Sequence, residues 1–241
     1  MKILGIDPAP SKNSVVFDGK EFKEYNVNNL KKFIKSFKDN EVLICWDAPL
    51  DFDINFANFY YRPIELFFKA NNKKENDYQV ELPKGISMSP IAGCPHWLMS
   101  QYVIGYPAIY YQNNEIFLIR KEEDLQKHQQ NRLKIIEVHP ALAIWIWLKE
   151  EKDNDKKWQY KKDKKVFKEI LELLLKKEII SYEDKNNIIN YNDDYLDSYI
   201  AWKLGYMLIN NPEKVMLLDN MLLPIDYSIK EKYENFLKYL K

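Results

Sequence analysis

The stretch Met1-Lys-Ile-Leu-Gly-Ile-Asp-Pro8 is an apolar run that carries a single carboxylate, Asp7, to its far end. It predicts a short buried strand that finishes on an acid, which is a natural place for a functional site. Residues 14–17 and 22–27 predict two further strands, and the Asp18-Gly19 pair between them is a hairpin signal. The chain is therefore expected to open as an antiparallel meander.

A second acid-bearing strand follows one helix. Apolar residues recur at i, i+3, i+4 and i+7 between Leu30 and Phe37, which is the pattern of an amphipathic helix. Residues 42–46 then form a continuous apolar run that leads to Asp47, as in a strand buried on both faces of a sheet. If this strand lies parallel and adjacent to the first, their ends are about 5 Å apart. Asp7 and Asp47 then share one edge of the sheet.

A third acid-bearing strand is predicted after a long irregular region. It begins at Leu133 and carries Glu137. The run 141–148 after Pro140 is apolar on every side, which predicts a wholly buried helix with proline at an early position.

The helix expected to begin near Asp193 also carries acids. Projected at ~100° per residue, it places Asp197 within its buried stripe and Asp194 at the margin of that stripe. An unpaired buried carboxylate is costly, so Asp197 must be neutralised, hydrogen-bonded or bound to a cation. One interpretation is a cation shared with the strand-borne acids. The other is that Asp193 and Asp194 cap the helix while Asp197 pairs with a Lys or Arg.

Residues 48–130 differ from the rest of the chain, because they hold most of the prolines and many aromatic residues and no long periodic segment. We interpret them as an insertion or cap within a single domain that spans 1–241. Within it, 62–68 predicts a short helix, 71–77 a polar loop, and 110–119 one or two strands around an Asn-Asn turn.

Composition limits the classes of function. The 241 residues include 36 Lys+Arg and 36 Asp+Glu, and this balance argues against a dedicated, sequence-blind nucleic-acid coat but allows a local basic groove. No stretch approaches ~18 uninterrupted apolar residues, and no signal peptide is evident, so we expect a cytoplasmic protein with no membrane contact. Cys45 and Cys94 are isolated and are expected to be reduced structural thiols.

Residues 149–168 contain nine Lys against five Asp and Glu, together with Trp158 and Tyr160. We interpret this stretch as a solvated linker and helix face. A nucleic-acid contact, in which lysines meet phosphates and the aromatic rings meet bases, is the alternative.

Four short motifs occur in a characteristic order: Ile-Asp7, Trp-Asp47-Ala-Pro-Leu50, Ile-Glu137-Val-His-Pro140-Ala and Asp194-x-x-Asp197-Ser-Tyr-Ile-Ala201. Together they resemble the DUF429 family of predicted nucleases with an RNase H-like fold. The wider resemblance is to Holliday-junction resolvases and other retroviral-integrase-like nucleases. It implies an α/β fold in which a mixed β-sheet is flanked by helices, with the Pro- and aromatic-rich insertion after the fourth strand.

The resemblance implies phosphodiester hydrolysis of DNA or RNA, structured or single-stranded, with Mg²⁺ or Mn²⁺. Asp7, Asp47 and either Asp197 or Asp194 are the expected metal ligands, with Glu137 as a fourth candidate. Hard oxygen ligands suit these ions, and two ions about 4 Å apart can stabilise both the attacking and the leaving oxygen. Junction resolvases act as dimers, so a homodimer is also allowed.

Three further residues are candidates for substrate contact. Lys12 is placed to meet a phosphate, although an exposed lysine is often only solvated. Arg62 is a bidentate phosphate anchor or a surface ion pair with Glu65. His139 is a proton shuttle or a hydrogen-bonded core residue.

Other classes of protein remain open. Actin-like and sugar-kinase-type ATPases share this core but cradle phosphates on glycine-rich turns, whereas this chain has six glycines and reads Pro-Ala-Pro-Ser-Lys after Asp7. A non-catalytic RNase H-like scaffold is the second alternative. A zinc site from Cys94, His96 and His128 lacks the usual ligand spacing.

Overall fold

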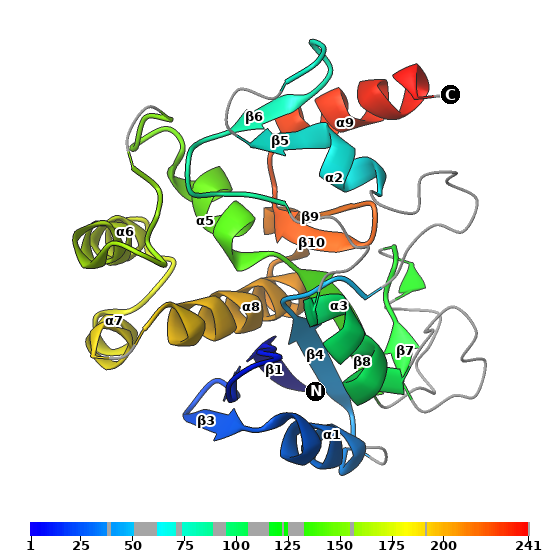
Figure 1. The fold of residues 1–241 in the computed structure, drawn as a ribbon, viewed down its shortest axis with the longest axis vertical. Helices are drawn as coiled ribbons and strands as arrows, with labels where there is room; N and C mark the ends of the chain where they lie inside the picture. The colour runs from blue at the N-terminus through cyan, green and yellow to red at the C-terminus, as the bar shows by residue number, and fades with distance from the viewer. Residues whose placement is uncertain are drawn as a thin grey trace.

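The computed structural model describes residues 1–37, 40–50, 62–70, 74–88, 95–105, 116–121, 123–124, 133–154, 157–190 and 192–240. In these ranges the architecture is built on one mixed sheet of eight strands (Figure 1). Seven strands follow the order β3-β2-β1-β4-β8-β10-β9, and β7 pairs with β8 beside this path. The strands are β1 (Lys2–Asp7), β2 (Ser14–Phe17), β3 (Phe22–Tyr25), β4 (Val42–Trp46), β7 (Phe117–Leu118), β8 (Leu133–Val138), β9 (Val215–Leu218) and β10 (Met221–Pro224).

The centre of the sheet is parallel and its two ends are antiparallel. Strand β4 pairs in parallel with both β1 and β8, and β8 pairs in parallel with β10. The predicted meander β1-β2-β3 and the β9-β10 hairpin are antiparallel. The fold is therefore α/β with a mixed sheet flanked by helices, which confirms the expected fold class and is consistent with an RNase H-like arrangement.

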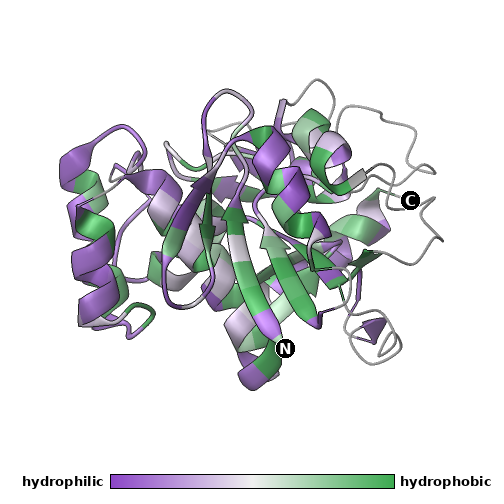
Figure 2. Cartoon of the chain, turned by 90° about the horizontal axis from the view of Figure 1, so that it is seen from below, coloured by the Kyte–Doolittle hydropathy of each residue, from purple (hydrophilic) through white to green (hydrophobic). Residues whose placement is uncertain are grey.

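Helices cover both faces of the sheet. Leu30 and Ile34 of α1 (Val27–Lys35) belong to the apolar cluster on one face, together with Ile44 of β4. Helices α5 (Pro140–Leu148) and α8 (Asp193–Asn210) belong to the cluster on the other face. The central strands are hydrophobic along most of their length (Figure 2), and α5 is buried along nearly all of its length, as expected for elements covered on every side.

The remaining elements lie around this core. The pair α6 and α7 packs beside α5 and α8, at the left of Figure 1. Helix α9 packs on α2, and a two-stranded parallel sheet, β5-β6, lies near them. These elements and the short turns are α2 (Pro63–Phe67), β5 (Phe68–Ala70), β6 (Val80–Leu82), α3 (Pro95–Ser100), η1 (Gln101–Gly105), α6 (Lys164–Lys176), α7 (Tyr182–Ile189), η2 (Pro212–Lys214) and α9 (Tyr227–Tyr239).

Local differences from the expected elements have simple causes. The third strand ends at Tyr25, earlier than predicted, because the Asn26 side chain accepts a hydrogen bond from the Asn29 amide and caps α1. Of the strands predicted over 110–119, only β7 lies within the described residues, and it joins the main sheet. None of the described helices combines the length and the apolarity needed to cross a membrane.

Two glycines let α8 lie directly on the sheet. A Cβ on Gly5 would stand 2.0 Å from the Ser198 carbonyl oxygen and 2.3 Å from the Trp202 amide nitrogen. A Cβ on Gly205 would stand 2.3 Å from the Cys45 Sγ. The helix backbone therefore rests directly on the β1 backbone at Gly5, and at Gly205 it rests on the Cys45 side chain of β4.

Gly205→Ala is expected to lower the free energy of unfolding by about 1–3 kcal/mol, because overpacking against Cys45 outweighs the gain in helix propensity. Urea unfolding measures the change. In a Cys45→Ala background the sulfur is absent, so the same substitution should cost less than half as much. Equal costs in the two backgrounds would contradict the packing described for Gly205.

Candidate functional site

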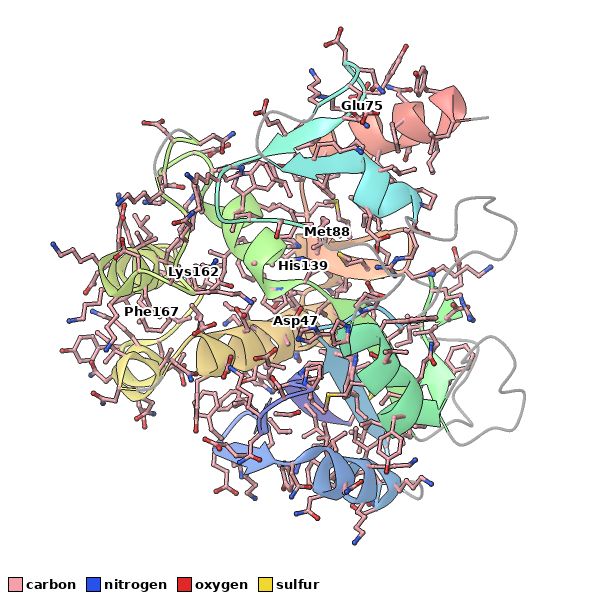
Figure 3. The ribbon with its side chains drawn as sticks, in the orientation of Figure 1. Asp47, Glu75, Met88, His139, Lys162 and Phe167 are labelled. Atoms are coloured by element: carbon pink, nitrogen blue, oxygen red, sulfur yellow. The ribbon has the colours of Figure 1, made fainter. Side chains whose placement is uncertain are left out.

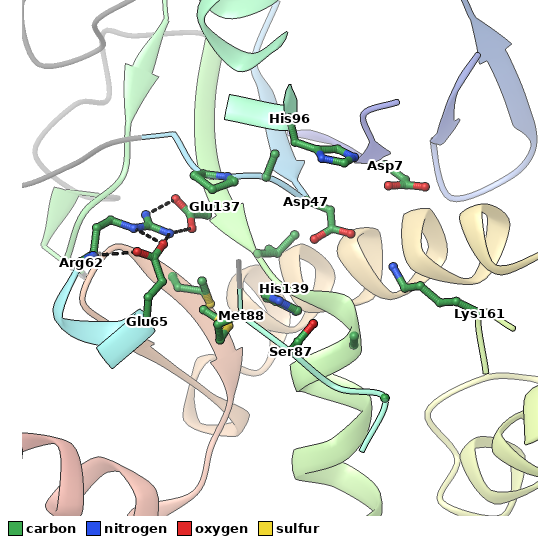
Figure 4. Close-up of a pocket in the computed structure, with 16 residues that line it drawn as sticks. Asp7, Asp47, Arg62, Glu65, Ser87, Met88, His96, Glu137, His139 and Lys161 are labelled. Atoms are coloured by element: carbon green, nitrogen blue, oxygen red, sulfur yellow. Dashed lines mark hydrogen bonds and ion pairs between the residues drawn. The ribbon is translucent and has the colours of Figure 1, made fainter. Parts of the chain in front are cut away.

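A pocket of about 240 Å³ opens where the central parallel strands end (Figure 4). Its walls come from the ends of β1, β4 and β8, from the start of β10, from α2, α3 and α5, and from two segments that lie between elements. The lining residues are Asp7, Asp47, Ala48, Pro49, Arg62, Glu65, Gly85, Ser87, Met88, His96, Glu137, Val138, His139, Ala141, Lys161 and Met221. Asp47 and His139 lie near the middle of the molecule (Figure 3).

Asp7 and Asp47 are neighbours because their strands are in register. Ile6 is paired with Trp46, and the Asp47 amide donates to the Ile6 carbonyl at 3.0 Å. The two acids therefore follow paired residues and project from the same face of the sheet. Within the described ranges, neither carboxylate accepts a hydrogen bond or forms an ion pair. The sequence-based expectation that they share one edge is confirmed.

Electrostatics in the pocket disfavour the charged state of both acids. Desolvation by burial, followed by repulsion from Asp47 and Asp197, raises the pKa of Asp7 well above its usual range. Desolvation also raises the pKa of Asp47, with Lys161 acting in the opposite direction and Asp197 and Glu137 adding repulsion. A cation placed at this pair would relieve the repulsion.

Asp197 reaches the same region from α8 and is fully buried. The hydroxyl of Tyr160 donates to its Oδ1 at 2.6 Å, and the Lys161 Nζ lies 2.5 Å from its Oδ2. The second contact is an ion pair without hydrogen-bond geometry. The close approach of Ser198 to Gly5 fixes the first turn and a half of α8 against β1, so Asp197 and Asp7 are held relative to one another by backbone.

Lys161 stands among these acids. Burial of its ammonium group disfavours the charge, but Asp197, Tyr160 and the acids Asp47 and Asp7 together outweigh it and raise the pKa of Lys161 well above its usual range. Desolvation and the Asp197 charge raise the pKa of Tyr160, so the phenol stays protonated and remains a donor. In Figure 4 the Lys161 ammonium points towards Asp47 and Asp7.

The lysine-rich stretch 149–168 agrees with the predicted solvated linker and helix face in most of its described lysines, which are exposed, but not in its aromatic residues. Trp158 and Tyr160 are buried, and Lys152 is buried and paired with Glu169 at 2.7 Å. Helix α6 does begin within the stretch, at Lys164, with Asp163 as its N-cap. The nucleic-acid alternative does not describe the aromatic rings either, because both are packed in the core.

Asp194 and Lys12 pair with each other beside the cluster. The Lys12 Nζ lies 2.5 Å from the Asp194 Oδ2. Asp194 is thereby supplied with its own cation, whereas Asp197 faces the strand-borne acids. Of the acids near the start of α8, Asp197 is the one that the structure brings to Asp7 and Asp47.

Glu137 lines the same pocket and adds repulsion at Asp47, but its own carboxylate is bound by Arg62. Its paired residue on β4 is Trp46, not Asp47. Its Oε1 and Oε2 accept from the two terminal nitrogens of Arg62, both at 2.7 Å, and Oε2 also accepts from the Leu50 amide at 2.9 Å. With both oxygens bound in this way, Glu137 would have to exchange one of these bonds to act as the fourth metal ligand that the family resemblance implied, so that role stays a prediction.

Arg62 is buried, which corrects the prediction of a surface residue or phosphate anchor. Besides Glu137, its Nε donates to the Glu65 Oε1 at 2.8 Å. The expected partner Glu65 is therefore present, but the pair is a desolvated three-residue network (Figure 4). A guanidinium held by two carboxylates is occupied, so the network supports the pocket wall.

His139 acts as a helix cap. Its Nδ1 accepts from the Leu142 amide at 3.2 Å at the start of α5. Burial and the positive charge of Lys161 lower the pKa of His139 to about 4, and a hydrogen bond with the Ser87 backbone opposes this change. A neutral imidazole with one nitrogen committed to the backbone favours the core role over the proton shuttle.

The carboxylates of Asp7, Asp47 and Asp197 fit a hard divalent cation in the type of their donor atoms and in their charge. Carboxylate oxygens are the ligands that Mg²⁺ and Mn²⁺ take, and one of the buried Asp197 oxygens has no hydrogen-bond donor among the described residues. Among the described residues, no group of three or more His, Cys, Asp or Glu side chains is arranged so that it could hold one metal ion. The open carboxylates are the pair Asp7 and Asp47. Cys94 and His128 of the zinc alternative lie outside the described residues.

Sequence reasoning did not place Tyr160, Lys161 or His96 beside the carboxylates, although it named Tyr160 as a nucleic-acid contact and His96 as a zinc ligand among its alternatives. His96 lines the pocket from α3, and its ring faces Asp7 in Figure 4. An aromatic pair, Trp158 and Tyr160, inside a charged run was the signal that this stretch packs against the core.

Comparison with known proteins identifies a family for part of the chain. Residues 116–211 match the model of the family described as "Protein of unknown function (DUF429)". The match covers β8, α5, Lys161 and Asp197, and it confirms the DUF429 resemblance. No curated protein and no solved structure matches the chain.

Proposed function

We propose that the protein is a divalent-metal-dependent phosphodiester hydrolase that acts on nucleic acid. The observation that carries the proposal is the placement of Asp7 and Asp47 side by side at the pocket, repelling each other and lacking a cation of their own in the described chain. Asp197 adds a third carboxylate from α8. The DUF429 match and the RNase H-like arrangement of the sheet support the same reading.

The residues have separable tasks in this mechanism. Asp7 and Asp47 would hold Mg²⁺ or Mn²⁺, which supplies neutralisation of phosphate charge and a water nucleophile at neutral pH. Lys161 offers an ammonium that can donate to a phosphate oxygen at the pocket. Arg62 fixes Glu137, which holds the Leu50 amide and thereby the turn that follows Asp47.

The size of the pocket favours a phosphate over a whole nucleotide. At about 240 Å³ it is smaller than the ~300–1,000 Å³ of sites that enclose small-molecule ligands. A phosphate group presented by a larger substrate fits such a space, and the rest of the substrate would lie on the surface. This observation argues against the actin-like and sugar-kinase-type ATPases.

The test is cleavage of end-labelled single-stranded, duplex and branched DNA and of RNA, with Mn²⁺, Mg²⁺ or chelator. We expect cleavage of at least one substrate with metal, none with chelator, and loss of activity in Asp47→Asn. The exposed Asp77→Asn is the matched control and should behave like wild type. If wild type binds no Mn²⁺ by electron paramagnetic resonance, the hydrolase proposal fails and a non-catalytic scaffold takes its place.

A further inference from the structure

We propose that the Lys161 ammonium takes the place of a second divalent ion among the carboxylates of Asp7, Asp47 and Asp197. The protein then binds one divalent ion, at Asp7 and Asp47, and works with this ion and a lysine instead of two ions. The inference rests on the proposed function, because it concerns the same site. It concerns how many ions the site takes and what replaces the second one.

Both oxygens of Asp197 already have a partner, which is a hydrogen-bond donor at Oδ1 and a positive charge, without a hydrogen bond, at Oδ2. Tyr160 donates to Oδ1 at 2.6 Å and the Lys161 ammonium lies 2.5 Å from Oδ2. Asp7 and Asp47, in contrast, have no cation within ion-pair distance among the described residues. A divalent ion that enters the pocket therefore meets two open carboxylates and one that is already neutralised. Mg²⁺ is commonly bound by one or two carboxylates together with waters and substrate phosphates.

The charge balance points to the same stoichiometry. Counted among these four residues alone, three carboxylates (Asp7, Asp47 and Asp197) and one ammonium (Lys161) leave two negative charges, which one divalent ion neutralises. Asp194 does not alter this count, because Lys12 is its partner. A second ion would leave two uncompensated positive charges in a desolvated site, and such charges are costly.

Lys161 is held in place and is not a mobile surface lysine. Trp158, three residues earlier, is fully buried, and its ring nitrogen donates to the Asp153 carbonyl at 3.1 Å. On the other side, Asp163 caps α6. Gly85, with a φ of +113°, lies so close to Gln159 that a Cβ would meet its backbone nitrogen at 2.7 Å.

The exposure of Lys161 fits a role at the mouth of the pocket. Its side chain is 46% exposed overall, whereas its ammonium is desolvated among the acids. An ammonium has three donors. One side of it faces Asp197, and the residue lines the pocket together with Asp7 and Asp47, so a donor remains for a phosphate oxygen.

The experiment counts Mn²⁺ ions per chain by calorimetry and electron paramagnetic resonance. We expect one ion for wild type, two for Lys161→Met and one for the neighbouring, exposed Lys162→Met control. If Lys161→Met does not fold, judged by circular dichroism, Lys161→Gln carries the test with the same expected second ion.

The outcomes separate the two proposals. Two ions in wild type, or one ion in both wild type and the Lys161 variant, would overturn the role of Lys161 and leave the metal-dependent hydrolase standing. No ion in any variant would overturn both.

Discussion

Replacement of Asp7 by Asn is expected to abolish metal binding and hydrolysis while making the metal-free protein more stable. The affinity for Mn²⁺ should fall by more than ~10²-fold, since changes to groups that only support metal ligands already cost ~10–100-fold. The stability gain follows from the raised pKa of Asp7, which shows that folding disfavours its charge. Each unit of such a rise corresponds to about 1.4 kcal/mol, so a gain of about 1 kcal/mol or more is expected.

The dependence on pH has a definite sign. An aspartate with a raised pKa binds its proton more tightly in the folded than in the unfolded chain. The metal-free wild type should therefore lose stability as pH rises from the ordinary Asp value of 3.8 through the raised values of Asp7 and Asp47. Asp7→Asn should show a shallower loss over the same range.

Thermal unfolding in chelator at several pH values measures both effects. Asp77→Asn, at a fully exposed position, is the control and should leave the curve unchanged. A decrease in stability for Asp7→Asn near neutral pH would mean that the ionised carboxylate has a stabilising partner, contrary to the site described.

Arg62→Met is expected to cost about 3–5 kcal/mol of unfolding free energy, as removal of one partner from a buried ion pair does. The substitution leaves Glu65 and Glu137 buried without their common cation. Both carboxyls would then favour protonation, so the loss should shrink as pH is lowered towards 5. Urea unfolding at pH 7 and pH 5 measures this difference.

Two companion variants sharpen the result. Arg62→Lys keeps a charge but cannot bind Glu137 with two nitrogens, so an intermediate loss is expected. Adding Glu137→Gln to Arg62→Met removes one unpaired charge and should recover part of the stability. A loss below about 1 kcal/mol for Arg62→Met, the range of an exposed pair, would contradict the burial of the network.

The sheet and two of the acids could be predicted because their signals are local. The apolar runs that end at Asp7 and Asp47 define buried strands, and parallel neighbours must present their ends together. The projection of α8 also placed Asp197 correctly within the buried stripe of the helix, because helical periodicity is fixed over so short a distance.

The role of Glu137 could not be predicted, because it depends on register. A shift of one residue exchanges the two faces of a strand, and no local pattern stated whether Glu137 or Val138 lies beside Asp47. The structure pairs Glu137 with Trp46, and its carboxylate is bound by Arg62 at the wall of the pocket.

Lys161 could not be found from composition for a related reason. A run of lysines looks the same whether each ammonium meets water or a carboxylate. Lys161 is distinguished from the other lysines by the buried aromatic residues Trp158 and Tyr160 beside it. Their burial arises from packing against segments more than sixty residues away in sequence, such as the one that contains Gly85.

The contact of Gly5 with α8 has a consequence for how this site can change. Gly5 is two residues from Asp7 and Ser198 is next to Asp197, so the separation of these carboxylates is set by main chain resting on main chain. Core substitutions elsewhere can weaken the protein without moving the acids apart. The distance between these two carboxylates is therefore fixed by the backbone. Adjustment to an ion of another radius has to come from a movement of Asp47 or from a side chain of another length at position 161.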